Sequence, residues 1–146
     1  MVLSRQNLPT LDRTKFGSAD GATKGGYTVL DTEGTPDAIL IGTGSEVQIC
    51  LDAAEALAKD GVKARVVSMP CWKLFDEQPQ SYQDEVLPPA VTNRVAVEAG
   101  IEMGWGKYLG ASGKFVGMTG FGASAPAEEL YEHFGITAAK VAAAAK

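Results

Sequence analysis

The sequence predicts an α/β domain of three layers, in which helices cover both faces of a mixed sheet of about five strands. Short apolar runs recur along the chain, and continuous apolar runs are typical of parallel strands that are buried on both faces. These runs occupy residues 38–42, 64–69, 94–99 and 114–118. Segments with helical spacing separate them, as right-handed crossovers between parallel strands require.

A further strand is predicted at residues 27–31, and only about six residues separate it from the strand at 38–42. A parallel pairing of adjacent strands needs a crossover of about a dozen residues or more. We therefore expect the strand at 27–31 to run antiparallel to its successor, if the two pair, and to form an edge of the sheet.

The spacing of apolar residues, together with glycines and prolines at the ends of each segment, predicts the helices. The helix that starts at Glu46 has one apolar stripe and ends at Gly61 as a C-cap; the stripe consists of Val47, Cys50, Leu51, Ala54, Leu57 and Ala58. Two short helical pieces are expected within 71–92, where prolines interrupt the chain. A helix is predicted over 100–109 despite Gly104 and Gly106, which would need a close backbone contact beside Trp105. Two more helices are predicted, one from Pro126 to Phe134 and one from Thr137 to Lys146.

The central strand leads into the turn Gly42-Thr43-Gly44-Ser45-Glu46-Val47. Glycines between a strand and a helix can bring backbone N–H groups against a phosphate. Val47 stands where a dinucleotide fingerprint needs a third glycine, and Glu46 places a negative charge on the first helical turn. Ser45 and Gln48 instead fit a capping box, so we interpret this turn as a structural corner.

Length and composition limit the possible functions. The chain has 146 residues and a formal net charge of −5, which disfavours partners such as nucleic acid or an anionic membrane. Two cysteines make no disulfide framework, and one histidine makes no metal cluster. No run approaches the ~18 apolar residues of a membrane span, and the first residues lack the apolar h-region of a signal peptide. We expect a cytoplasmic protein with residues 1–26 as a tail and linker and residues 27–146 as one domain.

Ligands of open α/β sheets usually bind beyond the carboxyl ends of the strands. The candidates there are polar side chains that follow the four predicted parallel strands: Thr43, Ser45, Glu46, Ser68, Glu98 and Glu102. Glu98 and Glu102 fit a paired acid and base, or a cap and a hydrogen-bond partner. Because no nucleophile, metal set or histidine accompanies them, the second interpretation is favoured.

Four other residues could take part in catalysis or binding, but each also fits a purely structural role. Cys71 follows a strand and fits either a nucleophile at a helix start or a partly buried thiol. His133 lies near a helix end, where a protonated imidazole suits the dipole. Trp72 and Trp105 fit core anchors or interface residues. The residues taken alone predict no catalytic site.

Taken together, five motifs resemble the C-terminal part of transketolase, the thiamine-diphosphate enzyme that moves two-carbon ketol units between sugar phosphates in the pentose phosphate pathway. The motifs are SRQNLP at 4–9, AILIGTGSEV at 38–47, RVVSMP at 65–70, VAVEAG at 95–100 and FGASAP at 121–126. Related thiamine enzymes carry similar C-terminal domains, and the first and last motifs favour transketolase.

The resemblance implies that Arg5 contacts the phosphate of the sugar substrate in the full enzyme, a contact that a guanidinium fork suits. It also implies that thiamine diphosphate, Mg²⁺ and the catalytic residues belong to earlier domains. We therefore expect no catalytic, cofactor or metal residue in this chain, whether it is a fragment or a separately encoded piece. Its expected role is structural support and subunit contact in a homodimer, without activity alone. The alternatives are a regulatory module that binds a small molecule in the crevice at the strand exits, and a subunit of a split transketolase.

Overall fold

Strand β2 (Ala38–Gly42) lies at the centre of a five-stranded sheet with the order β1-β3-β2-β4-β5. The computed structural model describes Ser4 and residues 6–146, so the prediction for Arg5 lies outside the described residues. Strands β3 (Ala64–Ser68) and β4 (Arg94–Ile101) pair parallel to β2 on either side, and β5 (Lys114–Met118) pairs parallel to β4. The mixed, mostly parallel sheet is thus confirmed.

Strand β1 (Tyr27–Leu30) forms one edge of the sheet and is antiparallel. Its hydrogen-bonded neighbour is β3, with Tyr27 opposite Ser68, and not the successor β2. The short connection from β1 to β2 therefore passes the start of β3, where Asp37 and Lys63 exchange hydrogen bonds, instead of forming a hairpin. The amide of Gly17 donates to the carbonyl of Val29 at 2.8 Å, so the preceding connector lies along the outer edge of β1.

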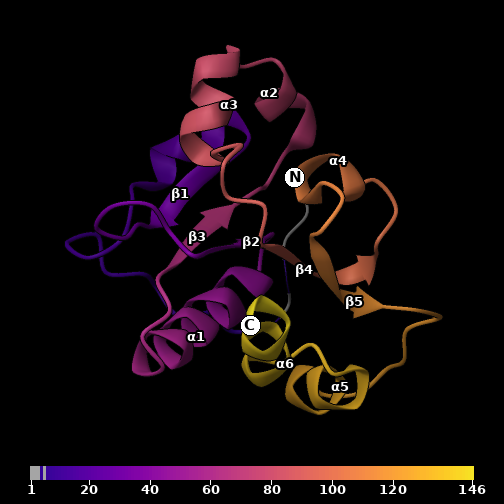
Figure 1. The fold of residues 1–146 in the computed structure, drawn as a ribbon. Coiled ribbons are helices and arrows are strands. Elements are labelled where there is room, and N and C mark those ends of the chain that lie inside the picture. Colours follow the sequence, from indigo (N-terminus) through magenta and orange to yellow (C-terminus); the bar gives the residue numbers. More distant parts are fainter. Residues whose placement is uncertain (1–3, 5) are drawn as a thin grey trace.

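Helices cover both faces of the sheet (Figure 1). Helices α1 (Glu46–Lys59), α5 (Ala127–Phe134) and α6 (Ala138–Ala145) lie on one side. The other side carries α2 (Trp72–Asp76), α3 (Gln80–Val86) and α4 (Gly106–Leu109). Successive side chains of β2 point to opposite faces of the sheet and so contribute to both cores. Leu40 packs toward α1 and α6, while Ile39 and Ile41 pack toward the aromatic side chains of α2 and α4. This is the period of two that a doubly covered strand requires.

Two predicted segments differ from the structure. The helix over 100–109 is wrong, because β4 continues to Ile101 and only Gly106–Leu109 is helical. Gly104 adopts a φ of +94°, a left-handed conformation that interrupts any helix at this point. The connector at 10–26 also contains a 3₁₀ helix, η1 (Ala19–Lys24). Among the helices of the described residues, none has both the length and the apolar character needed to cross a bilayer.

Candidate functional site

The loops after β2 and β4 leave the sheet toward opposite faces. The loop after β2 leads into α1, whose buried residues join the core on one side, while the loop after β4 leads to Trp105 and α4 on the other. In open α/β sheets such a divergence creates the crevice in which ligands bind. Ser45 and Glu46 follow β2, Glu98 lies in the last half of β4, and we take this edge as the candidate site.

A hydrogen-bonded cluster of three side chains occupies this edge. The hydroxyl of Tyr131, from α5, lies 2.6 Å from Glu46 Oε1 and 3.0 Å from Ser45 Oγ. The Ser45 hydroxyl also donates to Glu46 Oε1 at 2.8 Å. Glu46 is only 5% exposed. Because the single proton of Tyr131 is drawn most strongly to the carboxylate, Tyr131 and Ser45 both stabilise the buried charge of Glu46.

The cluster also reaches the N-terminal segment, since Gln6 Nε2 donates to the Tyr131 hydroxyl at 3.4 Å. Burial raises the pKa of Tyr131 to about 12, and the hydrogen bond and charge of Glu46 contribute in the same direction. At neutral pH the tyrosine is therefore protonated and serves as a donor. Its role here is to hold α5 and the start of α1 together.

The predicted capping box at Ser45 and Gln48 is wrong. The backbone N–H of Gln48 donates to the carbonyl of Ser45 at 3.3 Å, in a tight turn that leaves the hydroxyl free to bond Glu46. The Gln48 side chain donates to Asp52 Oδ1 at 2.7 Å instead of reaching back. The amides of Glu46 and Val47 also donate to carbonyls within the turn, at 3.2 and 3.4 Å. None of these three amides is left for a phosphate, which agrees with the interpretation of a structural corner.

The carboxylate of Glu98 is the hydrogen-bond acceptor of a buried tryptophan. Its Oε2 accepts a hydrogen bond from Nε1 of Trp105 at 2.7 Å, and Trp105 is fully buried. A buried indole N–H needs such a partner. Glu102 lies exposed in the following loop, where its carbonyl accepts from the Trp105 amide at 3.0 Å. The carboxylate of Glu98 thus has a buried partner, whereas Glu102 bonds Trp105 through its main-chain carbonyl.

The two tryptophans belong to one aromatic cluster on the α2 and α4 side of the sheet. The rings of Trp72 and Trp105 pack edge to face, with centroids 5.2 Å apart. A close contact explains why position 104 is a glycine, although the contact is with Trp72 and not with Trp105. A Cβ at Gly104 would lie 2.7 Å from Cη2 of the Trp72 ring. Both tryptophans are therefore packing residues within this chain.

The other candidates do not join the crevice cluster. Cys71 is partly buried at the start of α2, and His133 is exposed on α5 with its ring against Phe134. Ser68 is buried at the end of β3, and Thr43 is partly buried after β2. Within Ser4 and residues 6–146, no group of three or more His, Cys, Asp or Glu side chains could hold a metal ion.

The sequence did not suggest Tyr131, which is the partner of both Ser45 and Glu46. Tyr131 lies 85 residues from Glu46 along the chain, and no local motif marks such a pairing. One feature of the sequence could have indicated such a partner. Glu46 opens a helix directly after a buried strand, and a carboxylate that becomes buried there needs a hydrogen-bond donor from elsewhere in the chain.

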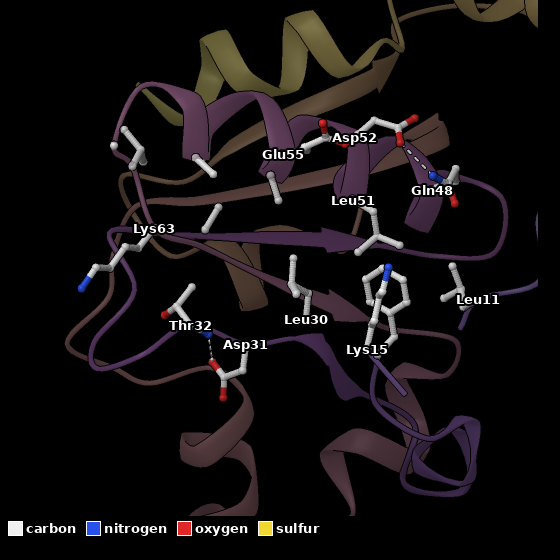
Figure 2. A pocket seen from close by; sticks show the side chains of 16 residues that line it. Leu11, Lys15, Leu30, Asp31, Thr32, Gln48, Leu51, Asp52, Glu55 and Lys63 are labelled. Atoms are coloured by element: carbon white, nitrogen blue, oxygen red, sulfur yellow. Dashed lines mark hydrogen bonds between the residues drawn. The ribbon is translucent and has the colours of Figure 1, made fainter. Parts of the chain in front are cut away.

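A groove of about 700 Å³ lies away from the crevice, between α1, the end of β1 and the connector (Figure 2). Leu11, Leu30 and Leu51 line it with apolar side chains, Lys15 lies between them in this view, and Asp52 lies further along α1. Smaller hollows of about 240 and 230 Å³ flank the crevice cluster, one beside Ser45 and one beside Tyr131.

Three large apolar side chains are exposed at or beyond the carboxyl ends of β4 and β5. Ile101 is 52% exposed, Met103 is 78% exposed and Phe121 is fully exposed. Ile101 ends β4 opposite Met118, the last residue of β5. Exposed apolar side chains that gather at one edge of a domain mark a surface of contact more often than a free surface.

Comparison with known proteins agrees with the fold and identifies the family. A family profile described as "Transketolase-like TK C-terminal domain" matches residues 25–137. Transketolase of Aquifex aeolicus is 51% identical over 142 residues, and chloroplastic transketolase of Solanum tuberosum is 55% identical over 148 residues. These matches cover 97% and 100% of this chain but 21% and 20% of the relatives, so the chain spans about a fifth of their length.

A solved structure shows the same arrangement of strands and helices. Transketolase of Pichia stipitis, in complex with sedoheptulose 7-phosphate, superposes with a TM-score of 0.85 at 40% identity, over 97% of this chain and 20% of that chain. The match extends beyond the residues that the family profile covers. The chain belongs to the transketolase family and corresponds to its C-terminal domain.

Proposed function

We propose that this chain is the C-terminal part of a transketolase, where it gives structural support and a contact surface and has no activity alone. The whole enzyme would transfer two-carbon ketol units between sugar phosphates. The polar groups at the strand exits support this role, because Ser45, Glu46 and Tyr131 bond one another and Glu98 bonds a buried tryptophan. Groups engaged in this way have little capacity left for substrate.

The observation that carries the contact role is the exposure of three large apolar side chains, Ile101, Met103 and Phe121. A fully exposed phenylalanine is unfavourable in water, and covering it stabilises an interface by roughly 2 kcal/mol. The proposed partners are the remainder of transketolase and the second subunit of a homodimer. Thiamine diphosphate and Mg²⁺ would be held by those other parts.

Arg5 is the proposed contact with the sugar phosphate in the assembled enzyme. The support comes from the family motif and from the Pichia stipitis relative, whose structure contains a sugar phosphate. The residue after Arg5 is Gln6, which bonds Tyr131 at the carboxyl edge of the sheet. Arg5→Ala in the assembled enzyme should raise the KM for phosphorylated acceptors and leave the KM for an unphosphorylated aldehyde unchanged.

A coupled assay tests the proposed role. The purified chain is given thiamine diphosphate, Mg²⁺, xylulose 5-phosphate and ribose 5-phosphate, first alone and then with the remaining domains of a transketolase supplied in trans. We expect no turnover alone and turnover in the mixture. The double variant Met103→Ser, Phe121→Ser should weaken this complementation, whereas Leu74→Ser on α2, which also removes an exposed apolar side chain, should not. Turnover by the chain alone at the level of a full enzyme would refute the proposal.

The groove between α1 and β1 favours a second candidate, a regulatory module that binds a small molecule. Its volume of about 700 Å³ lies in the range typical of ligand pockets. A thermal-shift screen with nucleotides and sugar phosphates separates the two candidates, since a ligand at 100 times its Kd stabilises by about 2.7 kcal/mol. A shift that Leu51→Lys abolishes would support the regulatory module, and the absence of any shift would favour the structural role.

We propose the cytoplasm as the compartment, because both cysteines, Cys50 and Cys71, are free thiols, as is usual in a reducing compartment. The relative from Solanum tuberosum is named chloroplastic, so a plastid location is the alternative that has to be tested. Fractionation of the source cells, with detection of the chain by antibody, tests this placement.

A further inference from the structure

The loop between β5 and α5 projects from the body of the domain (Figure 1). Every residue from 119 to 126 is exposed, and Phe121 at its centre makes no contact that shields its ring from water. An apolar ring held entirely in water is the least favourable position that this side chain can adopt. The loop therefore has a reason to take a second conformation.

An apolar hollow of about 230 Å³ lies directly beside this loop. Its apolar walls come from β4, β5, α5 and the turn after α5, and their large members are Met118, Leu130, Phe134 and Ile136. A dry cavity of about 150 Å³ is already large enough to bind benzene, so this hollow can hold a phenyl ring. Gly122 and Ala123 of the same loop line the hollow, which places Phe121 one residue from its rim.

Glycines on both sides of Phe121 allow the chain to turn there. A Cβ added at Gly120 or at Gly122 would meet no atom within 4 Å, so neither glycine is present to relieve a clash in the outward position. Glycine at such positions gives the backbone access to conformations that other residues avoid. Hinges of this kind absorb the dihedral changes of a moving loop.

We propose that the β5–α5 loop is a strap with two positions: an outward position that presents Phe121 to the remainder of the transketolase chain, and a closed position in which the Phe121 ring fills the hollow beside Tyr131. Closure is a property of this chain alone. Only the use of the outward position for docking rests on the proposed function. A partner that binds Phe121 would shift the strap to the outward position by its preference for that state.

Tryptophan at position 121 reports the position of the strap. Phe121→Trp is compared with the double variant Phe121→Trp, Ala99→Phe, in which a bulky side chain at the exposed residue Ala99 plugs the hollow. Acrylamide quenching is measured for both, after subtraction of the chain without the added tryptophan. If half of the molecules are closed, the quenching constant of the unplugged variant is about twofold lower than that of the plugged one. Equal constants overturn the proposal.

Methyl NMR of the unmodified full chain gives a second measurement that does not depend on the tryptophan. Closure predicts NOEs from the Phe121 ring to the methyl groups of Met118 and Ile136, and ring-current shifts of these methyls that disappear in Phe121→Ser. The absence of both overturns the proposal. Neither result depends on transketolase activity, so failure of complementation in the coupled assay and failure of closure are distinguishable.

Discussion

Replacing Tyr131 with phenylalanine removes only the oxygen that joins α5 to the start of α1. This oxygen lies 2.6 Å from Glu46 Oε1, on a carboxylate that is 5% exposed. A hydrogen bond to a charged group contributes roughly 1.5–3 kcal/mol, and its loss leaves the buried charge with fewer donors. Because the ring and its packing remain, we expect the free energy of unfolding to fall by about 2 kcal/mol.

Urea denaturation followed by far-UV circular dichroism measures this loss. With a slope of about 2 kcal/mol/M for a small domain, the midpoint should fall by about 1 M. The matched control is Tyr82→Phe, which removes the same atom from a hydroxyl that donates to the neutral carbonyl of Gly26 at 2.9 Å. Its expected loss is about 1 kcal/mol. An equal loss in the two variants would refute the assignment of Glu46 as a buried charge that Tyr131 stabilises.

Three further predictions use the same measurement of unfolding. Burial raises the pKa of Tyr131 from 10.0 to about 12, so its stabilisation is fully present below pH 10 and falls as the pH rises toward 12. The difference in stability between the parent and Tyr131→Phe should therefore narrow over that window. Gly104→Ala should cost about 3 kcal/mol, because φ is +94° and the new Cβ meets the ring of Trp72. Gly110→Ala, with a φ of +70° and open space, should cost only about 1 kcal/mol. The Arg94 guanidinium donates to four main-chain carbonyls, of the turn before β4 and of α4. Arg94→Lys should cost about 2 kcal/mol and speed amide exchange in that turn.

The sheet was predictable because its strands are apolar on both faces. Strands β2 and β5 begin and end at the residues that the apolar runs predict, and all five residues of β2 are buried. The short β1–β2 connection also predicted the antiparallel direction of β1. These features depend on local composition and chain length, which a single sequence contains.

Pairing partners and irregular segments were less predictable. Nothing local to β1 indicates that it pairs with β3, since that choice depends on where the connection crosses the sheet. The segment after Glu98 combines apolar residues with glycines and fits a helix by spacing. Its register against β5 shifts between Glu98 and Ile101, and Gly104 turns left-handed against Trp72, so tertiary packing overrides the local pattern.

The capping box shows why a local motif can fail at a buried helix start. Ser45 and Gln48 have the residue types and spacing of the motif, but Glu46 lies between them and is buried. A buried carboxylate needs donors more than an exposed amide does. The hydroxyl of Ser45 therefore bonds Glu46, and a tyrosine from a distant helix completes the set.

The position of the crevice alone does not make it a binding site in this chain. Ligand binding at the carboxyl ends of parallel strands requires polar groups with free hydrogen-bonding capacity. Here the Ser45 and Tyr131 hydroxyls converge on Glu46, and Glu98 is bonded to Trp105. The side chain that lacks a favourable contact is instead on the outer surface, where Phe121 is fully exposed beside a hollow that can hold its ring. The hydrogen bonds at the crevice thus give it a structural role, and the proposed contact surface lies instead at the β5–α5 loop.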